Sequence, residues 1–368
     1  MNELWSIIFI LLCWIISFVE PSGWSEATHF TEHVNYILLI IGGLFILKNQ
    51  LNWHRYEQKV WSGIFVVCMI LTMMIIPYIM SNGISSWSYM IAFVVTYIAS
   101  KCTITQKVIR VTGISYALAG LVILLIYTNG ELLSGWNDNA MAMVGLFSFL
   151  YFCTYLVIIR HTNSFLIWNI ITLLFISLLF KTDSRSGMLF SVLAILAIVF
   201  RDGSGLFFSK RRNQLLLLNI PIIIAFIVVQ FAKTDMFELL NLWSLESFEK
   251  PLFNGREELW LKAWDYLVDS HYLGTGEFLI NYHNSGMAAL SVFGILGYIV
   301  WIKYFSKALA YINNWIFDEI IFGCVLSFFL IFLQQSVELG FIEPVPNLIP
   351  YVILGMGLGR ARMLQNNE

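Results

Sequence analysis

The sequence predicts an all-helical, polytopic membrane protein with about twelve transmembrane helices. Hydrophobic residues make up 59% of the chain. Charged residues make up only 12% of it, whereas a soluble domain carries roughly 25%. The hydrophobic residues also gather in runs close to the roughly 17–25 residues that a bilayer crossing requires. The net charge of −2 argues against a nucleic-acid partner.

The apolar runs follow one another along the whole chain, with polar connections between them. They cover residues 4–19, 32–47, 60–80, 84–100, 108–127, 140–159, 164–180, 187–200, 214–232, 287–305, 316–333 and 348–359. The first run has no basic flank and no small-residue cleavage site after it. We therefore expect a retained helix there and not a cleaved signal peptide.

The positions of Lys and Arg predict the orientation, because these residues concentrate in cytoplasmic connections. With the N-terminus in the cytoplasm, all but six of the 21 Lys and Arg residues lie on the cytoplasmic side, and so does the C-terminus. The exceptions are Lys181, Arg185, Lys233, Lys250, Arg256 and Lys262. Local ion pairs explain Lys233, Lys250 and Lys262 most simply. Arg185 could likewise pair with Asp183, and Arg256 with Glu257. For these two arginines, however, we favour a role in the protein's function.

A long polar segment, residues 233–286, follows the ninth predicted helix and forms a large extracytoplasmic loop before the tenth. Its apolar residues over about 255–269 recur at helical spacing and predict an amphipathic helix. Asn254 and Glu257 resemble a capping box at its start. Trp260 and Trp264 on the apolar stripe suit a helix that lies at the membrane interface. The alternative is a small globular plug with the stripe as its core.

One histidine stands out, because His283 lies in a polar cluster directly before the tenth predicted helix. An imidazole can take a proton from a hydroxyl near neutral pH. The guanidinium groups of Arg185 and Arg256 present planar, permanently charged forks that suit phosphate. These residues favour transfer from a lipid-phosphate donor to a hydroxyl acceptor, and transport through the helices stays open as an alternative. The loop contains no cysteine, so no CxxC metal site is predicted there.

Four short motifs then suggest a family. They are Thr182-Asp183-Ser184-Arg185-Ser186-Gly187; Gly255-Arg256 with Trp260, Gly274 and Gly276; His283-Asn284 with Gly294 and Gly297; and Asn137-Asp138-Asn139-Ala140. In their order, their spacing and their predicted side of the membrane, they resemble the O-antigen polymerase / O-antigen ligase family of bacterial surface-polysaccharide enzymes.

This resemblance implies a C-type glycosyltransferase fold in the bacterial cytoplasmic membrane. It implies a polyprenyl-diphosphate-linked oligosaccharide as the donor, no cofactor and no metal. Membrane lipid and other polysaccharide-assembly proteins, namely a flippase and a chain-length regulator, are the expected partners.

The resemblance also implies roles for individual residues. Arg185 and Arg256 would hold the diphosphate, and His283 would act on the acceptor hydroxyl as a base or as an orienting group. The remaining motif residues would bind substrate. They are Asp183, Ser184, Asn284, Gly274, Gly276, Trp260 and Asn139.

Three alternatives to a polymerase stay open. A ligase would move finished glycan to another acceptor, but the compact loop and the lack of an appended acceptor-binding domain favour the polymerase. A polysaccharide transporter or flippase would carry ionisable residues buried in mid-span, and the predicted spans have almost none. A scaffold protein in polysaccharide assembly would tolerate loss of the two arginines and the histidine.

Overall fold

The computed structural model of the chain describes residues 2–19, 37, 60–129, 138–162, 164–182, 184–248, 251–338 and 347–367. Helices form all the regular secondary structure in these ranges, and no strand occurs in them. The predicted all-helical class is confirmed.

In chain order, the α-helices are α1 (Glu3–Val19), α5 (Gly63–Ile70), α6 (Ile76–Ser81), α7 (Met90–Ser100), α8 (Gln106–Thr128), α9 (Asp138–Ile159), α10 (Ser164–Lys181), α11 (Arg185–Val199), α12 (Arg201–Ser209), α13 (Arg211–Phe231), α14 (Asp235–Phe248), α15 (Arg256–Asp269), α16 (Ser285–Ile312), α17 (Glu319–Gln334) and α18 (Ile349–Asn367). A π-helical turn at Leu71–Ile75 joins α5 to α6.

Several of these helices are long and apolar enough to cross a bilayer, so the chain is a multi-pass helical membrane protein. In the described ranges, five stretches meet this test: Gly63–Ser81, Gln106–Thr128, Met141–Ile159, Arg211–Phe231 and Ser285–Trp315. The bent pair of α11 and α12 adds a sixth if it counts as one span. The apolar parts of α1, α7, α10 and α17 are shorter. The predicted segment 32–47 lies outside the described residues, except for residue 37.

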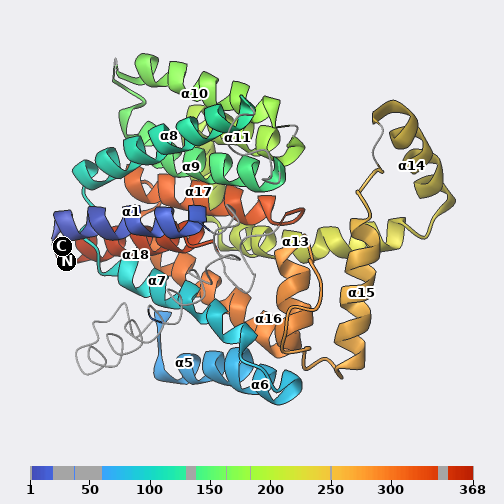
Figure 1. Cartoon of the computed structure of the whole chain (residues 1–368). Helices are drawn as coiled ribbons and strands as arrows, with labels where there is room; N and C mark the ends of the chain where they lie inside the picture. Colours follow the sequence, from blue (N-terminus) through green and yellow to red (C-terminus); the bar gives the residue numbers. More distant parts are fainter. Residues whose placement is uncertain are drawn as a thin grey trace.

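Helix α17 forms the centre of the bundle. It contacts α9, α18, α11 and α13, and its side chains are buried along nearly its whole length. Small residues allow the close approach, since a Cβ on Gly323 would lie 2.8 Å from the Cα of Thr154 in α9. Both chain termini lie at one end of the bundle, and α14 and α15 lie at the opposite end (Figure 1).

The long loop contains two helices. Helix α15 spans Arg256–Asp269, as predicted, whereas α14 was not predicted. The predicted capping box is wrong, because Gly255 with φ +74° is the N-cap residue and no side chain caps the helix. Helix α15 contacts α13 and α16, and Trp260, Ala263 and Leu267 of its apolar stripe are buried in protein, whereas Val268 is exposed. A location of α15 at the membrane interface stays a prediction.

Helix α16 breaks at Gly294, whose φ of 69° and ψ of −176° are not helical. The turn at 272–276 lies against the break and bonds to its free backbone groups. Thr275 N and Gly276 N donate to the carbonyls of Ser291 and Val292 at 2.9 and 3.0 Å. Ile295 N donates to the carbonyl of Tyr272 at 3.1 Å. A broken helix is tolerated at membrane depth when protein groups replace its lost hydrogen bonds in this way.

Candidate functional site

The candidate site forms around the carboxylate of Glu338, where Arg256 and His283 meet. Arg256 Nη2 donates to Glu338 Oε1 at 2.8 Å. His283 Nδ1 lies 3.7 Å from Glu338 Oε2. The Arg256 and Glu338 side chains are only 17% and 11% exposed, so water screens this pair weakly.

Three elements deliver these side chains to one place. Arg256 is the first residue of α15, directly after the left-handed turn at Gly255. His283, itself in a left-handed conformation with φ 45°, precedes the N-cap residue of α16. Glu338 follows the end of α17 at Gln334. Figure 1 shows α15 and the first part of α16 side by side, at the end of the bundle away from the termini.

Asn284 fixes the start of α16 to two other helices. Its side-chain oxygen accepts from Met287 N at 2.9 Å and caps the helix. Its amide donates to the carbonyls of Pro221 in α13 and Ser336 after α17, at 2.8 and 2.9 Å. Asn284 is fully buried, so these bonds hold the backbone beside His283 in place.

Trp260 of α15 also holds the backbone next to His283 in place. Its indole Nε1 donates to the carbonyl of Tyr282 at 2.8 Å, and the ring is 1% exposed. Because Trp260 lies one turn after Arg256, this bond sets the distance between Arg256 and the histidine that follows Tyr282. Burial raises the pKa of the Tyr282 phenol, which contacts Ser291 Oγ at 3.2 Å.

The two glycines predicted to bind substrate, Gly274 and Gly276, lie close against protein backbone. Gly274 has φ 90°, and a Cβ there would overlap the backbone nitrogen of Gly294 in the α16 break. Gly276 has φ 79°, and a Cβ there would overlap the backbone carbonyl of Pro77. Both positions therefore require glycine for conformation and for close approach.

Arg185 is not in contact with the Glu338 group. It is the first residue of α11 and is exposed, and it has no hydrogen bond or ion pair within the part of the chain that the structure describes. Ser184 is the N-cap residue of α11, accepting from Gly187 N at 3.3 Å. Helix α11 packs on α17, the helix that leads to Glu338. Asp183 lies outside the described residues, as does the side chain of Asn139.

A small cavity opens beside the site, between α13, α15 and the start of α16. Its volume is about 150 Å³. Phe226, Trp264 and Met287 line it, with Lys233 as its one cationic lining residue. Trp260 also lines it, which places the cavity one helical turn from Arg256.

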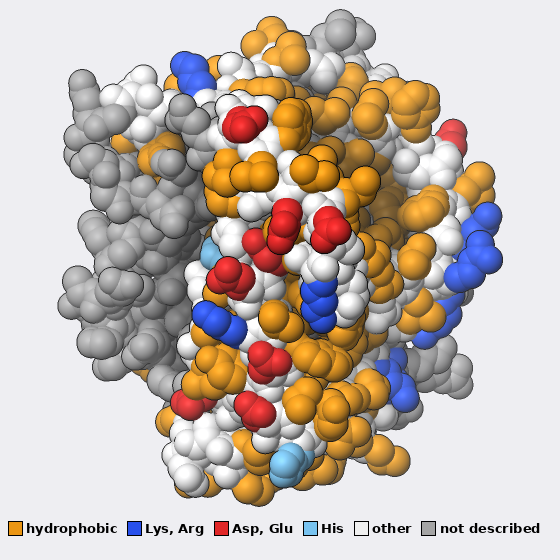
Figure 2. Space-filling model, turned by 90° about the vertical axis from the view of Figure 1, so that its right-hand side faces the viewer, with side chains coloured by type: hydrophobic (Ala, Val, Ile, Leu, Met, Phe, Trp, Pro, Cys, Tyr) orange, Lys and Arg blue, Asp and Glu red, His pale blue; other side chains and the backbone are white. Residues whose placement is uncertain are grey.

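The surface around the site is acidic. Figure 2 shows this end of the molecule, where Asp and Glu side chains gather across the middle among hydrophobic ones. Helix α14 carries Asp235 and Glu238 in its first turn, and α15 carries Glu257 and Glu258 in its own. These carboxylates would repel an anionic ligand at long range. Such a ligand would therefore bind only through direct contact with an arginine side chain.

The group at Glu338 resembles a carboxylate–histidine pair with a neighbouring cation. The Nδ1 atom of His283 is buried and has no hydrogen bond among the described residues. A proton on Nδ1 that faces Glu338 leaves Nε2 with a lone pair, able to accept a proton. The arrangement suits general-base chemistry beside a guanidinium group.

Sequence reasoning missed Glu338. The orientation argument counted only Lys and Arg, and the connection 334–347 contains neither. The signal was present, because Glu338 and Glu343 are the acidic residues of that connection, and the polar residues Gln334, Gln335 and Ser336 lie two to four positions before Glu338.

Comparisons with protein-family models, with curated proteins and with solved structures found no match.

Proposed function

We propose that the protein is a polysaccharide polymerase of the bacterial cytoplasmic membrane. It transfers a glycan from a polyprenyl diphosphate to a hydroxyl of an acceptor lipid-linked repeat unit. The meeting of His283 and Arg256 at the Glu338 carboxylate carries this proposal. The resemblance of the surrounding motifs to the O-antigen polymerase / O-antigen ligase family supports it.

In the proposed reaction, the acceptor hydroxyl oxygen bonds to the anomeric carbon of the donor glycan. The bond from that carbon to the diphosphate oxygen breaks, and polyprenyl diphosphate leaves with the bonding electrons. His283 Nε2 takes the hydroxyl proton. Glu338 Oε2 lies 3.7 Å from Nδ1, and shortening of this contact to a hydrogen bond when substrate binds would hold the imidazole in the orientation and tautomer that this step needs.

The two arginines have different roles in this proposal. Arg256 shares its guanidinium group with Glu338, so it presents its remaining N–H groups to the diphosphate. Arg185 is exposed at the start of α11, and in this proposal its guanidinium group also binds the leaving diphosphate. Stabilising charge that develops on a leaving diphosphate lowers the barrier to transfer.

The apolar cavity beside Trp260 suits the lipid part of the donor. Aromatic and aliphatic side chains line it, and it lies one turn from Arg256. A polyprenyl chain seated there would place its diphosphate near Arg256. Asn284, Trp260, Gly274 and Gly276 would then support the site through the protein contacts described above.

The proposed topology has twelve membrane spans with both termini in the cytoplasm. The shorter apolar helices α1, α7, α10 and α17 would cross the membrane with the longer ones. The Glu338 group and α15 would then face the outside, where a lipid-linked repeat unit is polymerised.

A product assay tests the proposal. Purified protein is incubated with a polyprenyl-diphosphate-linked oligosaccharide and EDTA, and the products are separated by mass. We expect lipid-linked glycans that grow by whole repeat units, and we expect His283→Ala to stop this growth. His271→Ala is the matched control, because His271 is an exposed histidine of the same loop that also has positive φ.

Other products would separate the alternatives. Glycan moved only to a non-polyprenyl acceptor would indicate a ligase. Lipid-linked oligosaccharide that crosses a vesicle membrane without extension would indicate a transporter. Full extension by His283→Ala would refute the assigned site.

A further inference from the structure

Two arginines, Arg160 and Arg201, lie close together in a cluster away from the Glu338 group. Helices α11 and α12 meet at Phe200 and are bent by 100° relative to each other. Arg201 begins α12, and it donates to the backbone carbonyl of Phe317, next to the start of α17. The neighbouring Asp318 binds Arg360 of α18 at 2.8 Å, so this cluster lies toward the C-terminal end of the chain.

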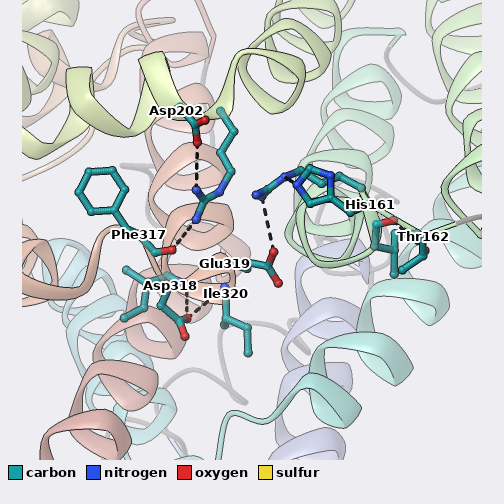
Figure 3. Close-up of polar contacts among 11 residues, drawn as sticks. His161, Thr162, Asp202, Phe317, Asp318, Glu319 and Ile320 are labelled. Atoms are coloured by element: carbon teal, nitrogen blue, oxygen red, sulfur yellow. Dashed lines mark hydrogen bonds and ion pairs between the residues drawn. The ribbon is translucent and has the colours of Figure 1, made fainter.

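Two guanidinium groups are held there under partial burial. The Arg160 and Arg201 side chains are 16% and 11% exposed. Arg160 Nε donates to His161 Nε2 at 2.9 Å, and Arg160 Nη1 lies 3.7 Å from Glu319. Figure 3 shows Glu319 and His161 on one side of the cluster, with Asp202 and Phe317 on the other.

These contacts leave donors unused. Arg160 Nη1 and Arg201 Nε are buried without a hydrogen bond in the part of the chain that the structure describes. The ion pair of Arg160 with Glu319 is longer than a hydrogen bond, and Asp202, the ionic partner of Arg201, is 93% exposed. Buried donors without an acceptor are costly, so an anion between them would stabilise this arrangement.

The electrostatic interactions of Arg160 also favour a bound anion. Burial lowers the pKa of Arg160, and repulsion from the nearby Arg201 lowers it further, against smaller opposing effects of Glu319 and Asp202. Two partly desolvated cations that repel each other attract a shared anion more strongly than a single exposed arginine does.

A cavity of about 530 Å³ connects these donors to an apolar surface. Its polar lining comes from Arg160, His161, Arg201 and Asp202, and its apolar lining includes Phe165, Val199 and Phe200. The Asp202 carboxylate is the one anionic group among these lining residues, and its side chain is 93% exposed, so water screens it. Val199 and Phe200 are also 62% and 66% exposed at the end of an apolar helix, where acyl chains would cover them in a bilayer. The cavity therefore places guanidinium groups that can bind phosphate next to apolar side chains that can contact an acyl chain.

We propose that this cavity binds the phosphate headgroup of an anionic phospholipid, with the arginines on the phosphate and an acyl chain along Phe165, Val199 and Phe200. Basic pockets between transmembrane helices bind such headgroups in general. This site is separate from the Glu338 group and does not depend on the proposed polymerase activity.

Native mass spectrometry of the full-length protein in detergent tests the proposal, with phosphatidylglycerol and phosphatidylcholine as the lipid probes. We expect the wild type to retain phosphatidylglycerol preferentially. Arg160→Gln and Arg201→Gln should each weaken that preference by roughly fivefold, and the double variant should lose it. Arg212→Gln, an exposed arginine in the first turn of α13, is the matched control and should keep it.

Three outcomes would overturn the proposal. They are equal retention of the two lipids by the wild type, an unchanged preference in Arg160→Gln, and complete displacement of the lipid by millimolar inorganic phosphate, which would indicate a soluble anion. If the double variant does not fold, Arg160→Gln decides alone, because it leaves the backbone contact of Arg201 intact. The thermal midpoint provides an independent readout, since phosphatidylglycerol should raise it in the wild type and less in Arg160→Gln.

Discussion

Glu338 is the residue on which the candidate site depends. Its two carboxylate oxygens face different partners, Arg256 at 2.8 Å and His283 at 3.7 Å. Loss of its charge therefore affects a cation and an imidazole together. Neither partner has another charged group within ion-pair distance among the described residues.

At this scale we predict the effect of Glu338→Gln, which keeps the shape of the side chain and removes its charge. The rate of glycan extension should fall by about 100-fold, because His283 loses its orienting carboxylate. Glu258→Gln, an exposed glutamate of α15, should change the rate less than about twofold. An equal effect of the two substitutions would contradict a special role for Glu338.

At the scale of elements, the break in α16 and the turn at 272–276 form one unit. Gly274 and Gly294 both have positive φ. A Cβ on Gly274 would overlap the backbone nitrogen of Gly294, and a Cβ on Gly294 would overlap the backbone of Leu273, directly before Gly274. The unit holds the first part of α16 beside α15, and so it holds His283 near Arg256. The sequence marked these glycines as a motif, but spacing alone could not reveal that they pack on each other.

We predict that Gly294→Ala destabilises the protein. Positive φ costs a non-glycine residue about 1–3 kcal/mol, and the new Cβ would overlap the backbone of Leu273. The unfolding midpoint in detergent should drop by roughly 5 °C or more. Gly63→Ala serves as the comparison, because no atom lies within 4 Å of a Cβ there and its midpoint should not fall. Equal midpoints would show that the break does not need glycine.

At the scale of the whole molecule, hydropathy predicted most of the helices, because runs of apolar residues mark them directly. It did not predict α14, whose residues mix acidic and apolar side chains. It left two readings of the apolar stripe of α15 open, since a Trp260 buried in protein and a Trp260 in lipid give the same pattern. Glu338 required three-dimensional structure, because 55 residues of chain separate it from His283 (338 − 283).

The orientation can be measured with single cysteines. Lys262→Cys on α15 should react with a membrane-impermeant maleimide in intact cells, and Arg212→Cys should react only after the cells are opened. The native cysteines Cys13, Cys102, Cys153 and Cys324 are buried, and the half-buried Cys68 is replaced by Ser in both variants to remove its background. The reverse labelling pattern would place the Glu338 group in the cytoplasm and exclude the proposed reaction.

The most direct test of the proposed mechanism asks whether Glu338 and His283 act as one unit in glycan transfer. The extension rate of lipid-linked oligosaccharide is measured for the wild type, Glu338→Gln, His283→Ala and the double variant. If the carboxylate works chiefly through the imidazole, Glu338→Gln should slow the His283→Ala variant far less than it slows the wild type, and the remaining loss is that of the Arg256 contact. Rate losses that multiply in the double variant, or a purified wild type that extends no glycan, would contradict the mechanism.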